Sequence, residues 1–189
     1  MALDFVNTLD DRHIKPKELL ETYMDLARFA EDTAIIQPQQ ARWLYERSYI
    51  DPAGSEKALL LGRELREAIH DVFWAVMNKQ APPVAALARL NTYAQAAAEQ
   101  MRVVPAKNGF EWQFDNFKDL RSVLWPIARS AAELLVSDQL PLVRACSSKV
   151  CEWFFLDTSK KHQRRWCDMT RCGNRAKVQR FYQRKKKAD

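Results

Sequence analysis

The segment CSSKVCEWFFLDTSKKHQRRWCDMTRCGNR, residues 146–175, decides the fold of the last quarter of the chain. It holds all four cysteines of the 189 residues, as two pairs with four residues inside each pair and fifteen between the pairs. Such pairs present four sulfurs from two tight turns to one ion, and the central span is that of a four-cysteine zinc site. The spacing therefore predicts one structural Zn²⁺, held by Cys146, Cys151, Cys167 and Cys172.

Two other chemistries of the cysteines stay open, disulfide bonding and redox switching. Disulfide-rich domains are usually small, secreted and dense in cysteine, whereas this chain starts Met-Ala-Leu-Asp-Phe, unlike a signal peptide. Four thiolates leave no open coordination position, which disfavours a catalytic zinc. His162 lies between the pairs and could replace one cysteine, although a lone loop histidine is more often solvated. Structural zinc is the favoured interpretation.

The charges divide the chain at almost the same place as the cysteines. Residues 1–143 carry 16 Lys+Arg and 20 Asp+Glu, a net charge of −4, while residues 144–189 carry 14 and 4, a net charge of +10. We expect a mostly helical domain over residues 1–139 and a zinc finger with a basic helix and tail over residues 140–189. No apolar run approaches the roughly 18 residues of a membrane span, so we expect a soluble, cytoplasmic protein without a membrane partner.

Apolar residues recur at helical spacing through most of the first part, and prolines mark several helix starts. A β-hairpin is expected between residues 102–106 and 110–114, because Asn108-Gly109 lies between two strand-like runs. Pro126 should kink or break the last helix near Trp125. The predicted fold class is therefore α+β, mostly helical with a small β-hairpin. The expected helices run from Pro16 to about Asp32, after Pro38, after Asp51-Pro52-Ala53-Gly54, from Pro82-Pro83 to about Gln100, and from about Phe117 to Ser137.

The residues between and after the cysteine pairs predict a hairpin and a helix. Residues 153–157 are aromatic and extended, and residues 164–166 lead back to the second pair, so a β-hairpin is expected to join the pairs. After Cys172 the periodicity is helical. Together these elements outline a treble-clef finger, which is too small to fold without its metal. The side chains expected beside the metal are Phe154, Leu156 and Trp166, and those expected on an inward face of the helix are Val178, Phe181 and Tyr182.

Two stretches resemble a known family. Cys172-Gly173-Asn174-Arg175, preceded by Arg164-Arg165-Trp166-Cys167, is similar to the signature of the CGNR-type zinc-finger proteins, and Leu3-Asp4-Phe5-Val6-Asn7-Thr8 resembles the start of the ABATE domain that precedes that finger. The family is bacterial, and its members are described as stress-related transcription regulators. The resemblance implies a mostly helical α+β first domain suspected of sensing a ligand. One departure is at position 161, where members often carry asparagine and this chain has Lys161. The lysine keeps the hairpin turn polar and basic.

The basic residues of the last part predict binding to nucleic acid, in the first instance DNA. Zinc would fix the hairpin and the helix against each other, so that their charges form one patch that binds phosphates through counterion release. Asn174, Gln179 and Gln183 are candidates for reading bases. Arg175 could read a base or instead pin the knuckle, and residues 184–187 could be a solvated tail. The predicted nucleic-acid-binding residues are Lys160, Lys161, Arg164, Arg165, Asn174, Arg175, Lys177, Arg180 and Arg184.

The helical part contains little recognisable chemistry, and the whole chain has four glycines and no glycine-rich phosphate loop. Asn7, Arg63 and Arg66 are the candidates for holding a small anionic ligand, with an internally paired, solvated surface as the alternative for the arginines. The favoured function is a DNA-binding transcription regulator with a ligand-sensing domain, suited to act as a homodimer on paired half-sites. The alternatives are an RNA- or protein-interaction adaptor and, less favoured, an enzyme acting on a small anionic molecule. We expect the protein not to be an enzyme.

Overall fold

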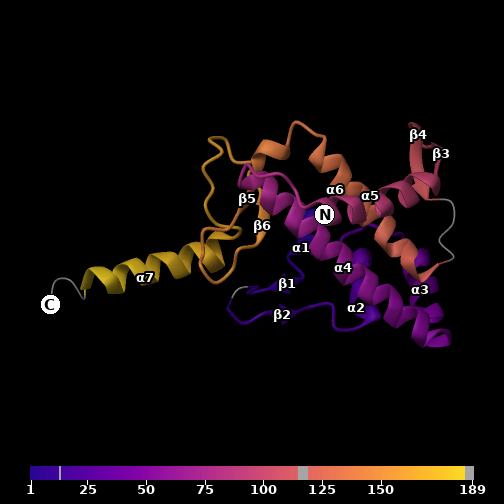
Figure 1. The fold of residues 1–189 in the computed structure, drawn as a ribbon, viewed down its shortest axis with the longest axis horizontal. Coiled ribbons are helices and arrows are strands. Elements are labelled where there is room, and N and C mark those ends of the chain that lie inside the picture. The colour runs from indigo at the N-terminus through magenta and orange to yellow at the C-terminus, as the bar shows by residue number, and fades with distance from the viewer. Residues whose placement is uncertain (13, 115–118, 186–189) are drawn as a thin grey trace.

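The computed structural model describes residues 1–12, 14–114 and 119–185 (Figure 1). Helices build most of the first part, and short strands and turns build the start of the second. The helices are α1 (Ala2–Val6), α2 (Tyr23–Asp32), α3 (Pro38–Ile50), α4 (Pro52–Met77), α5 (Val84–Glu99), α6 (Leu124–Leu135) and α7 (Asn174–Lys185). The strands are β1 (Leu9–Asp10), β2 (Lys17–Glu18), β3 (Met101–Ala106), β4 (Gly109–Phe114), β5 (Val143–Ala145) and β6 (Phe154–Leu156).

Helix α4 is the centre of the core and contacts α1, α2, α3, α5 and α6 (Figure 1). Asp51 caps it by accepting a hydrogen bond from the backbone N–H of Gly54, and Pro52 occupies its first turn. Its side chains Leu65, Ile69 and Phe73 are fully buried among residues from the surrounding helices. The apolar stripe expected from the sequence is therefore the axis on which the other helices pack.

Most predicted helix starts are confirmed, and the first is wrong. Helix α2 begins at Tyr23 rather than at Pro16, because Thr22 and Asp25 form a reciprocal capping box there. Lys17 and Glu18, expected to be helical, instead pair as β2 with β1. Pro126 lies in the first turn of α6, after a 3-10 turn over Leu120–Val123, so the expected break near Trp125 is confirmed. The expected helix start at Phe117 lies outside the described residues.

The predicted hairpin is confirmed as β3 and β4, which pair in antiparallel register with Ala106 opposite Gly109. It stands at the end of the molecule opposite α7 (Figure 1). Its Val103 and Trp112 pair across the strands and are exposed, as is Phe110. Within the described ranges, none of the helices combines the length and the apolar character that a bilayer crossing requires.

The second predicted hairpin is wrong in its pairing. Strand β6 pairs with β5, so the hairpin encloses the first cysteine pair instead of joining the two pairs. Residues 157–168, all of which the structure describes, form neither helix nor strand. The buried Asp157 explains the difference, because its carboxylate accepts hydrogen bonds from the backbone N–H groups of Ser159 and Arg164 and turns the chain. A side-chain-capped loop replaces the expected strand.

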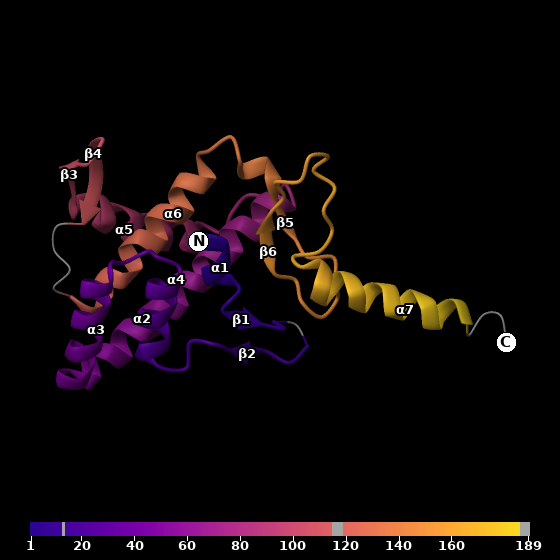
Figure 2. The same cartoon turned by 180° about the vertical axis from the view of Figure 1, so that it is seen from behind.

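Helix α7 projects away from the rest of the molecule in both views of the fold (Figures 1 and 2). Among its described residues none is buried. Val178, Phe181 and Tyr182 are 54%, 64% and 63% exposed, so the expectation that they face inward is wrong. The polar face of the helix, with Gln179 and Gln183, lies toward residues 147–150, which we call the cysteine loop. The aromatic face of the helix is exposed to solvent.

Candidate metal centre and basic surface

The four cysteines converge at the base of α7. Their sulfur atoms all lie within 4.8 Å of one another, with 3.5 Å between Cys151 and Cys167 and 3.8 Å between Cys167 and Cys172. A tetrahedral zinc with Zn–S bonds of about 2.3 Å requires sulfurs about 3.8 Å apart. All four are free thiols, and three of them are buried. The set therefore fits one structural Zn²⁺, as the spacing predicted.

The first two ligands are placed by the β5–β6 hairpin. The backbone N–H of Cys146 donates to the carbonyl of Trp153 at 2.9 Å, and that of Cys151 donates to Ser148 at 3.1 Å. Glu152 has φ of 53°, a left-handed conformation that reverses the chain between Cys151 and the strand. Both sulfurs are thus held by the turn of a short hairpin, which is the knuckle of the finger.

The second two ligands flank a capped turn. The Asp168 carboxylate accepts hydrogen bonds from the backbone N–H groups of Thr170 and Arg171 and caps a π-helical turn over Met169–Gly173. The N–H of Cys172 donates to the carbonyl of Asp168 at 3.0 Å. Asp168 was not among the residues expected to matter, although Asp-Met-Thr, like Asp157-Thr158-Ser159, follows the Asp-x-Ser/Thr pattern of a side-chain-capped turn.

Aromatic rings cover the cysteine cluster, and strand alternation decides which ones do. Phe155, Trp153 and Trp166 pack against the cysteines. Phe154 and Leu156 point the other way, into the main core, so only Trp166 of the three predicted neighbours is confirmed. Successive side chains of a strand lie on opposite faces, and the pairing of β6 with β5 gives the metal face to Phe155.

The thiols interact strongly because their sulfurs are so close. Hydrogen bonds from Cys151 and Cys167 lower the pKa of Cys146. The contacts with Cys146 raise the pKa values of Cys151 and Cys167. Protons thus stabilise only a partly ionised set, whereas a divalent cation stabilises four thiolates together. His162 lies apart from the cluster, with Nδ1 2.9 Å from the carbonyl of Asp157.

The predicted nucleic-acid-binding residues fall into four groups. Lys160 and Lys161 are exposed on the loop after β6. Arg165, Arg175 and Arg180 line a cleft beside α7, which also contains Ser147, Ser148 and Lys149, three residues that the sequence patterns missed. The side chains that bond within the finger are Arg164, which donates to the carbonyls of Trp166 and Cys167, and Asn174, which donates to Thr170. Lys177 and Arg184 are exposed on α7.

The three predicted ligand-binding residues have protein partners. Arg63 donates to the carbonyl of Leu20 at 2.6 Å. Arg66 is 3% exposed and makes two hydrogen bonds to Glu18, at 2.6 and 2.7 Å. Burial disfavours the charge of Glu18, but the hydrogen bonds and charge of Arg66 outweigh it and lower its pKa. These contacts correspond to the internally paired alternative, and a ligand role for them stays a prediction.

Asn7, the third of these residues, joins the helical part to the finger. Its side-chain amide donates to the carbonyl of Phe154 at 2.9 Å, and its oxygen accepts from the N–H of Phe154 at 2.8 Å. The Phe154 ring stacks against His70 and Trp74 of α4, with centroids 5.1 and 6.3 Å away. Trp153 adds a hydrogen bond of 2.8 Å to Asp10. One face of β6 therefore packs against the helical core and the other against the metal centre.

Two family models match the chain. Residues 1–138 match ABATE, described as "Putative stress-induced transcription regulator", and residues 143–185 match the CGNR zinc finger. The two matches stand in the order that the sequence motifs indicated. No curated protein matches the chain.

Proposed function

Because the chain belongs to the ABATE family, whose model covers residues 1–138, and carries a CGNR zinc finger after it, we propose that it regulates transcription by binding DNA through the finger. The observation that carries this proposal is the surface of α7. The helix has five cations and no acidic residue in twelve positions. The cations are Arg175, Lys177, Arg180, Arg184 and Lys185.

The charges of α7 favour a polyanion over a protein partner or a second copy of the same helix. Two such helices would repel each other, whereas phosphates gain from the release of counterions. Val178, Phe181 and Tyr182 are exposed between the cations, and apolar side chains in such positions can contact base edges and thymine methyl groups. A helix of twelve residues is about 18 Å long, and its diameter of about 10–12 Å with side chains matches the roughly 12 Å wide major groove of DNA.

A ligand-dependent change in the finger has a physical route through β6. A cavity of about 520 Å³ lies between α1 and β6 and touches both Asn7 and the zinc ligand Cys167. Leu3, Phe29 and Phe155 give it a largely apolar wall. We propose that a small molecule bound there would act on the metal centre through β6. A homodimer and a cytoplasmic location, both expected from the sequence, stay predictions.

Fluorescence anisotropy with zinc-loaded protein and a pool of random duplexes tests DNA binding. The slope of log K against log salt should be negative, by about 0.9 for each phosphate contact. Lys177→Glu with Arg184→Glu should abolish binding at moderate salt. Lys57→Glu with Lys107→Glu makes the same charge change on exposed positions of the helical part and should not. Salt-independent binding, or equal losses in both pairs, would contradict the proposal, and preference for RNA of equal length would favour the adaptor.

A further inference from the structure

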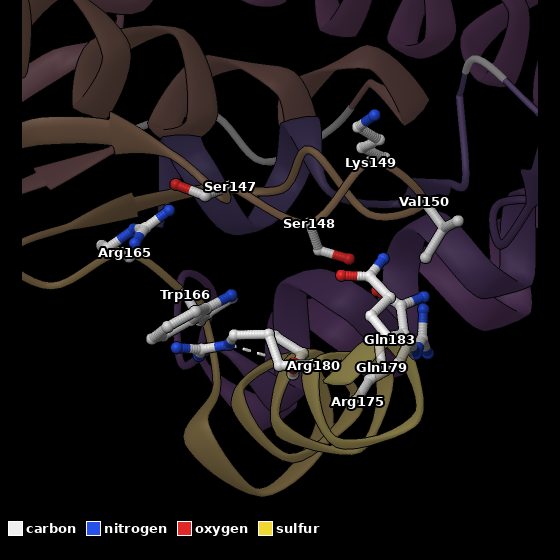
Figure 3. A pocket seen from close by; sticks show the side chains of 11 residues that line it. Ser147, Ser148, Lys149, Val150, Arg165, Trp166, Arg175, Gln179, Arg180 and Gln183 are labelled. Carbon is white, nitrogen blue, oxygen red and sulfur yellow. Dashed lines mark hydrogen bonds between the residues drawn. The ribbon is translucent and has the colours of Figure 1, made fainter. Parts of the chain in front are cut away.

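A cleft of about 420 Å³ separates the cysteine loop from α7 (Figure 3). Residues 147–150 form one wall and the polar face of α7 the other, with Arg165 and Trp166 between them. Four cations line this small space, and none of the described residues that line it is acidic. The four are Lys149, Arg165, Arg175 and Arg180.

The zinc site sets the width of the cleft. The wall formed by the loop begins directly after the ligand Cys146, and α7 begins two residues after the ligand Cys172. The N–H of Ser147 donates to the carbonyl of Arg165 at 2.8 Å, which attaches the loop to the segment before the second pair. The walls are therefore joined through the metal centre at one end and by a backbone hydrogen bond along one side.

Two of the three guanidinium groups that line the cleft lie against an aromatic ring. Trp166 lies between Arg165 and Arg180 in Figure 3, and their central carbons are 5.2 and 5.8 Å from its ring. Arg180 is further fixed by a hydrogen bond of 3.2 Å from Nε to the carbonyl of Ala176. Cations held against a ring lose less entropy when they bind a ligand. The cleft is thus a preorganised anion site.

We propose that this cleft seats one phosphodiester of the DNA backbone, an inference that rests on the proposed function. Guanidinium groups and the hydroxyls of Ser147 and Ser148 are the donors that phosphate oxygens accept. The volume is at the small end of ligand clefts, room for one nucleotide unit and not for a base pair. Seating one phosphate beside α7 between two fixed walls sets the register of the helix along the strand.

Phosphate ethylation interference on a selected duplex tests the proposal. For the wild-type protein, ethylation of one phosphate per finger should block binding. Arg165→Gln with Arg175→Gln should lower affinity roughly tenfold for each arginine, lower the salt slope by about 0.9 because one phosphate contact is lost, and remove the interference at that phosphate alone. Lys177→Gln with Arg184→Gln is the matched pair outside the cleft and should lower affinity but keep that interference. Zinc content and circular dichroism confirm that each variant is folded.

The outcomes separate this inference from the proposed function. Wild-type protein that binds no DNA contradicts the proposed function. DNA binding in which the Arg165 and Arg175 pair leaves every interference position unchanged overturns the cleft assignment alone. A titration with AMP and inorganic phosphate, measured by isothermal titration calorimetry, tests the other source of the same chemistry. Binding of either at micromolar concentration, with DNA unable to displace it, would overturn the assignment in favour of a free nucleotide or phosphate.

Discussion

Replacing Asn7 by alanine should destabilise the helical core and the zinc finger together. The change removes both hydrogen bonds to the Phe154 backbone, of 2.9 and 2.8 Å, and leaves its buried N–H and carbonyl without partners. Each lost hydrogen bond costs about 1 to 1.5 kcal/mol, and unsatisfied buried groups raise that cost. The expected loss is about 3 kcal/mol in the free energy of unfolding, or roughly 6 to 12 °C in Tm for a protein of this size.

The same change should speed the release of zinc, because Phe154 follows the ligand Cys151 by three residues. Urea unfolding measures the loss of stability, and transfer of zinc to a colorimetric chelator measures its release, which should be faster in the variant. Asn7→Leu keeps the volume without the hydrogen bonds and should behave like alanine. Asn91→Ala, at an exposed position of α5, should leave zinc release unchanged and raise stability only slightly, because alanine has the higher helix propensity.

Two results would refute this reasoning. A loss below about 1 kcal/mol would mean that water or a backbone shift satisfies the Phe154 groups without Asn7. A full loss of stability with unchanged zinc release would mean that β6 does not connect the two parts mechanically.

Three further changes have defined outcomes. Cys172→Ser should lower the zinc content from one per chain toward zero and increase hydrogen exchange in α7, while the helical part stays folded but unfolds at lower urea, since Phe154 belongs to its core. Burial lowers the pKa of His70, so the unfolded chain binds the proton more readily than the folded protein does. The free energy of unfolding should therefore fall as pH decreases from about 6.5 to the folded pKa, by at most about 1.4 kcal/mol per pH unit. His70→Phe should remove this pH dependence, measured as urea midpoints between pH 5 and 7.5. Ala34 has φ of 54° after α2, and Ala34→Gly should raise the free energy of unfolding by about 1 kcal/mol in urea titrations, whereas Ala88→Gly on the exposed side of α5 should lower it by about 0.5 to 1 kcal/mol.

Local chemistry accounts for the features that were predictable. Proline followed by an apolar stripe marked the starts of α3 and α4, and Asn108-Gly109 marked the β3–β4 hairpin. The cysteine spacing predicted the four-sulfur cluster. Each of these signals involves residues close in the chain, whose conformational preferences or ligand chemistry act without help from distant segments.

The features that could not be predicted depend on long-range partners. The sequence of β6 is compatible with pairing to either side, and the buried Asp157 together with Asn7, 147 residues before Phe154, selects β5. The pattern Val178, Phe181 and Tyr182 is that of a buried helix face, yet nothing in the described parts of the chain packs on it. Periodicity states which side chains share a face and cannot state what that face meets.

The cysteine pairs and the charge of the last 46 residues are properties of composition and spacing, and they suffice to identify a metal-stabilised, cationic module, since ligand chemistry and net charge do not depend on how distant segments pack. Which cations act together does depend on it. Arg165 and Arg180 are fifteen residues apart and meet across Trp166 because the cysteine cluster holds the segment before Cys167 against α7. Arg164, which directly precedes Arg165, instead donates a hydrogen bond to the carbonyl of Trp166 within the finger. The basic residues share a charge, and the fold separates those that hold the structure from those left free to bind.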